Sequence, residues 1–162
     1  MKNIVNCVSR KIGKYHIKKQ IGIGSTSKIF LAQDDQDNKF SIKVYHKNKF
    51  DKQFNNETNI LKSIDGECFP QIIDILNKND HNCIVFPYYN TKDLFDTLVP
   101  KLPINEYDIM NNLEKMTKPI LDLHEYNIAH LDIKLENYLV NKKNNKIILD
   151  DYGSASDKKK LS

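Results

Sequence analysis

Apolar residues recur with a period of two in several short segments of the first ninety residues. Residues 15–21 and 28–33 have strand-like apolar positions on either side of a turn rich in glycine and serine, which predicts a β-hairpin. Residues 39–45 alternate as a third strand, and residues 71–76 and 82–86 predict two more strands around a polar turn. The pattern therefore predicts five strands.

A helical period appears in two places. Residues 54–64 predict a short helix, and Glu57 is its only acidic residue. Residues 105–126 give the longest helical signal, because apolar residues recur there at steps of three and four: Ile109, Leu113, Met116, Ile120 and Leu123. We interpret this stripe as core packing and not as a cofactor site.

Length and charge narrow the class of protein. A chain of 162 residues suits one domain with a real core. The net charge of +4 comes almost wholly from lysine, with Arg10 as the only arginine. Arginine forks dominate base and phosphate recognition, so this composition argues against nucleic acid as a partner. Residues 1–14 are basic and aperiodic, which predicts a leader that packs loosely or not at all.

Cysteine usage and hydropathy suggest the compartment. Cys7, Cys68 and Cys83 are an odd number at unrelated spacings, which favours free thiols over disulfides or a metal site. No apolar run approaches the ~18 residues of a membrane helix, and the first residues do not form a signal peptide. We therefore expect a cytoplasmic protein that has no membrane partner.

The candidate chemistry lies between residues 130 and 153. Asp132 and Asn137 occur in a short segment between a helical pattern and a strand pattern, and Asp151 follows fourteen residues later. A tight loop between rigid elements can aim such groups at one small volume. Taken alone, Asp132 and Asn137 are more often turn-capping residues.

Two features upstream add to this picture. The turn from Gly22 to Ser27 carries two glycines, whose small size lets backbone N–H groups approach phosphates. Lys43 lies between Ile42 and Val44 in a predicted strand. Each feature has an ordinary explanation, because a plain hairpin and a solvated edge lysine are both common.

Together and in this order, the features resemble the signature set of the eukaryotic protein-kinase family. The glycine turn is similar to G-x-G-x-x-G, residues 40–43 to V-A-I-K, residues 130–137 to the catalytic loop, and residues 151–153 to D-F-G. The resemblance implies an α+β fold. It has a small lobe at about 15–86, with a five-stranded antiparallel sheet and one helix. A hinge follows at about 87–92, and a truncated, mainly helical large lobe at 93–162.

The resemblance also implies roles around ATP and Mg²⁺. Asp132 would be the catalytic base, and Lys134 would neutralise charge on the migrating phosphoryl group. Asn137 and Asp151 would hold Mg²⁺. Lys43, paired with Glu57, would contact the α- and β-phosphates. The glycine-rich loop would comprise Ile21, Gly22, Ile23, Gly24, Ser25, Thr26, Ser27, Lys28 and Ile29, with Ile29 over the adenine.

Three further positions carry expectations about the nucleotide. Pro87 would offer only its carbonyl to adenine, and Tyr89 would offer both N–H and C=O. A proline that simply ends an edge strand is an equally good explanation. Asp93 could accept hydrogen bonds from the ribose hydroxyls, cap the following helix, or do both.

The sequence departs from the family at several positions. Ser27 replaces the third glycine, and Leu131 stands where most members carry arginine, so activity should not depend on a phosphorylated activation segment. After Gly153 only nine residues remain. The A-P-E motif and the helices that bind protein substrate are absent, which indicates a truncated kinase.

Two main functions follow, with one further possibility. The first is transfer of the ATP γ-phosphoryl group to Ser or Thr hydroxyls of a protein substrate, and Lys134 fits the serine/threonine pattern. The second is a pseudokinase fragment that binds a nucleotide or a partner without catalysis. The third is a remnant that never folds stably.

Overall fold

A computed structural model describes residues 11–78, 80–142 and 144–157. The chain divides into two compact units. The first comprises the residues up to Phe54 together with Ile72–Tyr89, and the second comprises Asn55–Gln71 and the residues from Asn90 onward. The helix α1 (Asp51–Ser63) begins in the first unit and continues in the second.

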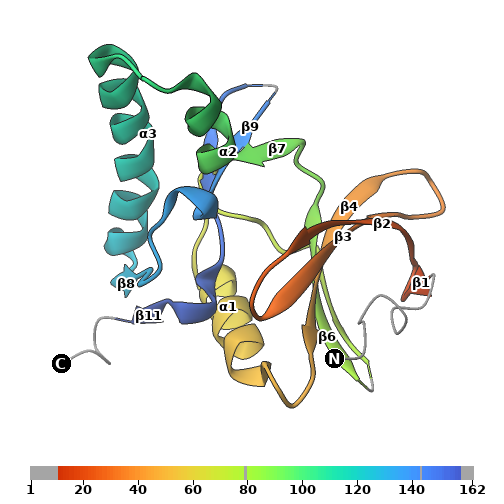
Figure 1. Ribbon diagram of the computed structural model, residues 1–162. Helices are drawn as coiled ribbons and strands as arrows, with labels where there is room; N and C mark the ends of the chain where they lie inside the picture. Colours follow the sequence, from red (N-terminus) through yellow and green to blue (C-terminus); the bar gives the residue numbers. More distant parts are fainter. Residues whose placement is uncertain (1–10, 79, 143, 158–162) are drawn as a thin grey trace. The chain divides into compact units, whose positions relative to one another are not determined.

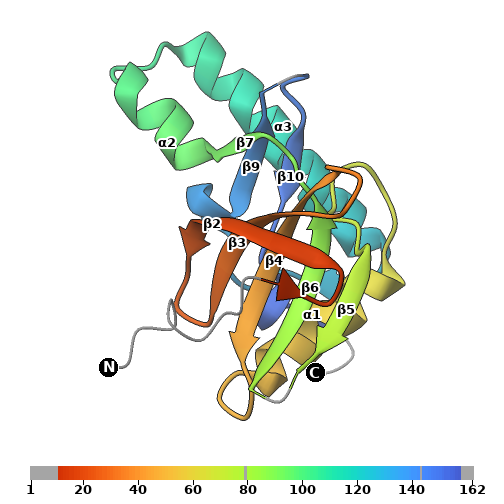
Figure 2. The same cartoon turned by 90° about the vertical axis from the view of Figure 1, so that its right-hand side faces the viewer.

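The first unit is an antiparallel sheet with the strand order β1-β2-β3-β4-β6-β5. Figure 2 shows β2, β3, β4, β6 and β5 side by side. The bounds of the six strands are β1 Lys11–Ile12, β2 Tyr15–Ile23, β3 Ser27–Gln33, β4 Lys39–His46, β5 Asp74–Asn77 and β6 His81–Pro87. The five predicted strands are present, although β5 begins three residues later than the predicted start at residue 71.

The two-residue strand β1 corrects the prediction of a loosely packed leader. Ile12 pairs with Tyr15 across β1 and β2, and both side chains are buried in the sheet core. The other buried members of this core are Phe30, Ala32, Ile42, Val44, Cys83 and Val85. The part of the leader that the structure describes therefore belongs to the sheet, which has six strands and not five. Residues 1–10 lie outside the described residues.

The second unit contains the long helix α3 (Glu106–Glu125; Figure 1). Asn105 caps α3, because its Oδ1 accepts a hydrogen bond of 2.8 Å from the Asp108 N–H. The predicted helix of residues 105–126 is thus confirmed. The short helical elements are α2 (Leu94–Leu98), η2 (Val99–Lys101), η3 (Leu135–Asn137) and η4 (Tyr152–Ser154).

Two small sheets complete the second unit. The strands β7 (Thr91–Asp93), β9 (Tyr138–Asn141) and β10 (Ile147–Leu149) pair in the order β10-β9-β7. The strands β8 (Ile128–Ala129) and β11 (Ser156–Asp157) form a two-stranded ladder. This ladder fixes the two ends of the segment from residue 130 to residue 155, which contains the predicted chemistry.

The apolar stripe of α3 is buried only at its end. Leu123 is fully buried, but Ile109 and Leu113 are 45% and 48% exposed. The prediction that the whole stripe packs in a core is therefore wrong for its first half. Periodicity finds the apolar face of a helix, but it does not say which elements cover that face.

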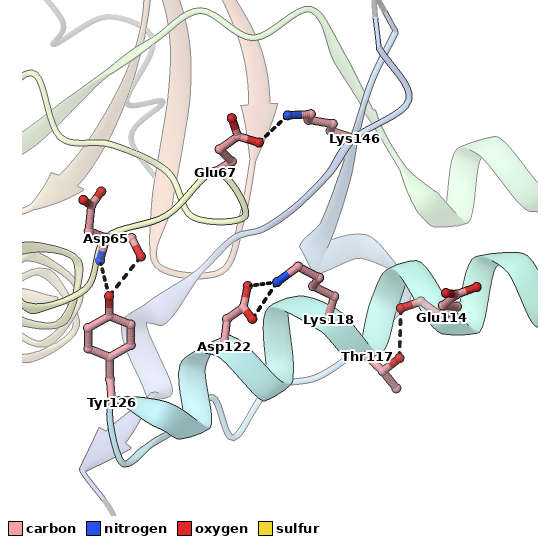
Figure 3. A network of polar contacts seen from close by, with 8 residues as sticks. All are labelled: Asp65, Glu67, Glu114, Thr117, Lys118, Asp122, Tyr126 and Lys146. Atoms are coloured by element: carbon pink, nitrogen blue, oxygen red, sulfur yellow. Dashed lines mark hydrogen bonds and ion pairs between the residues drawn. The ribbon is translucent and has the colours of Figure 1, made fainter.

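Polar contacts tie the loop after α1 to the rest of the second unit (Figure 3). The Tyr126 hydroxyl donates to the Asp65 carbonyl at 3.1 Å and accepts from the Asp65 N–H at 3.3 Å. Lys146 forms an ion pair with Glu67. These contacts hold the 65–67 loop against the residue that follows α3 and the residue that precedes β10. No helix in the described ranges has the length and apolar content that crossing a membrane requires.

Candidate functional site

The glycine turn joins β2 to β3. Gly22 pairs with Ile29, and the Gly24 N–H donates to the Ser27 carbonyl at 2.9 Å. A Cβ atom at Gly22 would lie 3.3 Å from Ile29 Cδ1, which is tighter than ordinary contact, so packing favours glycine there. At Gly24 a Cβ atom would lie 3.7 Å from the Ser27 carbonyl oxygen, which is an ordinary contact. The predicted loop from Ile21 to Ile29 is thus one continuous hairpin end.

Lys43 lies in the middle of the sheet. It pairs with Ile29 on β3 and with Ile84 on β6, and it is 5% exposed. Its Nζ atom is 5.6 Å from the centroid of the Tyr45 ring. Lysine is almost never this buried without a counter-charge, so the explanation of a solvated edge lysine is wrong.

Glu57 belongs to the second unit, on α1, and it is fully buried. The explanation of an ordinary surface charge is therefore wrong for this residue also. A buried carboxylate, like a buried ammonium, requires a partner of opposite charge or several hydrogen bonds. The pairing of Lys43 with Glu57 stays a prediction, because the two residues belong to different units.

Pro87 is the last residue of β6. It pairs with Phe40, and its carbonyl accepts a hydrogen bond of 3.3 Å from the Ser41 hydroxyl. The next N–H, that of Tyr88, donates to the Lys39 carbonyl at 3.1 Å. Tyr89 ends the first unit and is half-buried. The proposed contacts of Pro87 and Tyr89 with adenine stay predictions.

Asp93 caps α2 in the second unit. Its Oδ1 accepts a hydrogen bond of 2.7 Å from the Asp96 N–H, which is the N-cap geometry. The capping role that we expected for Asp93 is therefore present. Its contact with ribose stays a prediction.

His130 opens the loop that contains Asp132, and its hydrogen bonds fix its protonation state. Nε2 lies 2.9 Å from the Asp150 carbonyl, which can only accept, so Nε2 carries the proton. Nδ1 lies 3.4 Å from the Asp132 N–H, which can only donate. The imidazole is therefore neutral. Burial lowers the pKa of His130 in agreement with this assignment, although Asp150, Asp151 and Asp132 oppose the shift.

Asp132 is the centre of the loop. Lys134 Nζ donates to Asp132 Oδ2 at 2.8 Å, and Asn137 Nδ2 donates to the same oxygen at 3.1 Å. The hydrogen bond from Lys134 is the main cause that lowers the pKa of Asp132, and it also raises the pKa of Lys134. The carboxylate is ionised at neutral pH and is partly open to solvent, so it can accept a proton.

Asn137 is buried, with 6% of its surface exposed. Its Nδ2 also donates to the Asp132 carbonyl at 2.7 Å. Because both of these hydrogen bonds use the nitrogen end of the amide, the Oδ1 end is turned away from Asp132. The fold thus separates the two ends of this side chain, and the oxygen end suits a metal.

The β9–β10 hairpin brings Asp151 to the same place. Tyr138 pairs with Leu149, and beyond this pair the Asp150 N–H donates to the Asn137 carbonyl at 2.8 Å. Asp151 follows directly, with a left-handed backbone at φ 66° and ψ 72°. Asn137 and Asp151 are therefore neighbours at one end of the hairpin.

The donor set fits Mg²⁺. An amide oxygen and a carboxylate are hard oxygen ligands, which Mg²⁺ prefers. Within the described ranges, no three His, Cys, Asp or Glu side chains gather into a metal cluster. A Mg²⁺ ion here would thus need phosphate oxygens and water as further ligands, which is its usual mode of binding beside nucleotides.

Sequence reasoning missed Asn56. Its side chain contacts the segment after Asp151, yet it carries no motif of its own and precedes Glu57 in a polar run. No signal in the sequence distinguishes Asn56 from Asn55 or Asn59.

Comparisons with known proteins agree with this geometry. A family model described as "Protein kinase domain" matches residues 15–162. The chain is 27% identical over 146 residues to myosin light chain kinase A of Dictyostelium discoideum, covering 86% of this chain and 50% of that protein. It is 29% identical over 145 residues to the serine/threonine-protein kinase cds1 of Schizosaccharomyces pombe, with 83% and 32% covered.

A bacterial relative extends the comparison. The chain is 28% identical over 150 residues to the serine/threonine-protein kinase PrkC of Bacillus subtilis, covering 89% of this chain and 23% of that protein. The chain therefore belongs to the protein kinase domain family. It spans half or less of the length of these relatives.

Proposed function

We propose that this chain transfers the γ-phosphoryl group of ATP to Ser or Thr hydroxyls of a protein substrate. The observation that carries the proposal is the loop around Asp132, where Lys134 and Asn137 both donate to one carboxylate oxygen. A general base must be ionised and able to reach its proton. The ionised state and the partial exposure of Asp132 support that role.

Each polar residue of the loop has a proposed task. Asp132 orients the substrate hydroxyl and accepts its proton, while Lys134 balances the charge of the phosphoryl group in transit. Asn137 Oδ1 and the Asp151 carboxylate hold Mg²⁺, which supplies positive charge to the phosphate oxygens. His130 fixes the position of the loop, because it forms hydrogen bonds with the Asp150 carbonyl and the Asp132 N–H.

The nucleotide contacts are proposed on the same family pattern. Backbone N–H groups of the turn from Gly22 to Ser27 would approach the phosphates, and the lack of side chains at Gly22 and Gly24 supports this. Lys43 would contact the α- and β-phosphates, with Glu57 as its partner, and the burial of both charges supports a pairing. Pro87 and Tyr89 would bind adenine. The lobe boundaries at about residues 86 and 92 are part of this proposal.

A second candidate function is supported by exposed apolar residues along α3. Met110 and Leu121 are 61% and 62% exposed, and Tyr107 is 79% exposed. Exposed apolar faces of this kind mark interaction sites in other proteins. The alternative is thus a pseudokinase module that binds a nucleotide or a protein partner without transferring phosphate. We also propose a reducing, cytoplasmic location, since Cys68 and Cys83 are free thiols.

The first experiment measures thermal unfolding with and without Mg·ATP. We compare the wild type with Asp151→Ala, and with Asp35→Ala as a control at an exposed turn. Ligand at about a hundred times its dissociation constant stabilises a two-state fold by ~2.7 kcal/mol. We expect a shift that shrinks in Asp151→Ala only.

The other outcomes of this experiment separate the candidates. A cooperative transition with no shift in the wild type would contradict the kinase proposal and favour a partner-binding module. The lack of any transition would indicate a chain that does not fold stably. If binding is seen, transfer of labelled γ-phosphate by the wild type and by Asp132→Ala tests catalysis.

A further inference from the structure

We propose that Asn56 is a positioning residue for Asp151. It holds Tyr152, Gly153 and Ala155 from α1, and so maintains the left-handed backbone that aims the Asp151 carboxylate at the metal. The claim about the metal rests on the proposed function. The claim about the backbone does not.

The contacts of Asn56 converge on one short segment. Its Nδ2 group donates to the carbonyls of Tyr152 at 3.2 Å, Gly153 at 3.2 Å and Ala155 at 2.6 Å. Carbonyl oxygens only accept, so the NH₂ end of the amide must face them. Two N–H bonds serve three acceptors, which requires that one hydrogen be shared. The Asn56 side chain thus adds to the backbone hydrogen bond of this turn, which runs from the Ala155 N–H to the Tyr152 carbonyl at 3.2 Å.

The segment needs such a restraint because of Asp151 itself. A left-handed backbone is sterically disfavoured at residues with a Cβ, although less so at aspartate than at most others, and Asp151 adopts it at φ 66°. On the upstream side, Asp150 is fixed through its N–H to Asn137 and through its carbonyl to His130. On the downstream side, Asn56 on α1 donates hydrogen bonds to the carbonyls of residues 152, 153 and 155. Asp151 is therefore held from both sides.

The restraint bears on metal binding through geometry. Without the contacts of Asn56, the carbonyls of Tyr152, Gly153 and Ala155 lose their restraint from α1, and Asp151 can relax toward a negative φ. A change in φ and ψ at Asp151 moves its carboxylate relative to Asn137, which stays anchored by Asp132. Residues that orient metal ligands in this way typically contribute 10–100-fold to metal affinity.

The chain offers well-matched variants. Asn56→Ala removes the donor, and Asn56→Asp keeps the shape but brings a carboxylate oxygen against three carbonyls. Asn59→Ala is the control, because Asn59 is an exposed asparagine on the same helix. Asparagine and aspartate have similar helix propensities, so Asn56→Asp should leave the helix itself unchanged.

The experiment combines two measurements. Hydrogen exchange and NMR shifts of residues 150–155 report the backbone around Asp151. Titration of Mg²⁺ at fixed ATP, read by thermal shift, reports the metal. We expect faster exchange at residues 152–155, a changed Asp151 backbone shift, and a Mg²⁺ affinity about 10–100-fold lower in both Asn56 variants. Asn59→Ala should match the wild type, as should ATP affinity without Mg²⁺.

Each of the other outcomes contradicts a specific part of the proposal, either the backbone restraint or the effect on the metal. Unchanged exchange in Asn56→Ala would show that Asn56 does not hold the segment. Faster exchange with unchanged Mg²⁺ affinity would reduce Asn56 to a structural residue. If the wild type shows no Mg²⁺-dependent binding at all, the proposed function fails, and the metal-positioning role fails with it. The backbone measurement would still decide whether Asn56 restrains Asp151.

Discussion

The turn from Gly22 to Ser27 and the loop around Asp132 are two parts of the proposed site, and they differ in how many hydrogen bonds hold them. In the turn, one backbone hydrogen bond of 2.9 Å joins Gly24 to Ser27, and Ile23 is 72% exposed. In the loop, Asp132 receives hydrogen bonds on both its side chain and its carbonyl. Charge-stabilising groups are most effective when the fold orders them in advance, whereas a phosphate-binding turn can be ordered by its ligand.

The largest expected effect tests the loop. Asp132→Ala should lower the rate of γ-phosphoryl transfer by about 10²–10⁴-fold, because a positioned general base contributes that much. Initial rates at saturating Mg·ATP measure the effect, with Asp35→Ala as the control. Equal rates in Asp132→Ala and the wild type would mean that the ordered loop has no catalytic role, and the contrast with the turn would then be structural only.

Two buried tyrosines test whether a side-chain hydrogen bond next to the β9–β10 hairpin contributes to the free energy of unfolding. Tyr152 and Tyr138 are both fully buried. The Tyr152 hydroxyl donates to the Leu149 carbonyl at 3.1 Å, whereas the Tyr138 hydroxyl is the buried side-chain polar atom without a partner among the described residues. Tyr152→Phe should cost about 1 kcal/mol, and Tyr138→Phe should cost nothing or stabilise.

Urea unfolding at a constant m-value measures both tyrosine variants. Equal losses in the two would mean that the hydrogen bond to Leu149 is not what distinguishes them. A larger loss in Tyr138→Phe would imply a partner for its hydroxyl in solution.

The pH dependence of stability tests the neutral His130. Burial places its pKa below the usual 6.5, so between the two values the unfolded chain binds more protons than the folded chain. The stabilisation is therefore fully present above pH 6.5 and is lost as the pH falls through that window. Urea unfolding of wild type and His130→Gln between pH 7.5 and 5 should show a shallower pH dependence in the variant.

The smallest expected effect tests the turn. Ile23→Ala should change the free energy of unfolding by no more than about 0.5 kcal/mol, because the side chain is mostly exposed. The matched change Ile42→Ala in the buried sheet core should cost about 2–5 kcal/mol. Thermal unfolding of both variants makes the comparison. A large loss in Ile23→Ala would mean that the turn is ordered without ligand.

Local patterns predicted the elements well and their surroundings less well. The apolar period of α3 identified the helix to within one residue at each end. The same pattern could not show that Ile109 and Leu113 stay exposed, because burial depends on elements distant in sequence. The two-residue strand β1 is too short for any period, and only its pairing with β2 reveals it.

The residues of the proposed site also fall into those that the sequence predicted and those that it did not. Asp132, Asn137 and Asp151 stand at motif spacings, and the structure gathers them at one end of the β9–β10 hairpin. Asn56 and the tautomer of His130 were not predictable, since each depends on which carbonyl lies opposite. The contacts of Lys43, Glu57, Pro87 and Tyr89 with ATP stay predictions.

Leu131 has a consequence for how this loop can evolve. Its backbone is left-handed at φ 64°, which costs a leucine roughly 1–2 kcal/mol, yet its side chain is 55% exposed. Packing therefore does not require leucine here, and asparagine or glycine would adopt this backbone more readily. Replacing Leu131 with asparagine or glycine should therefore raise the free energy of unfolding. Such a change would let a destabilising but useful mutation elsewhere in the loop be tolerated.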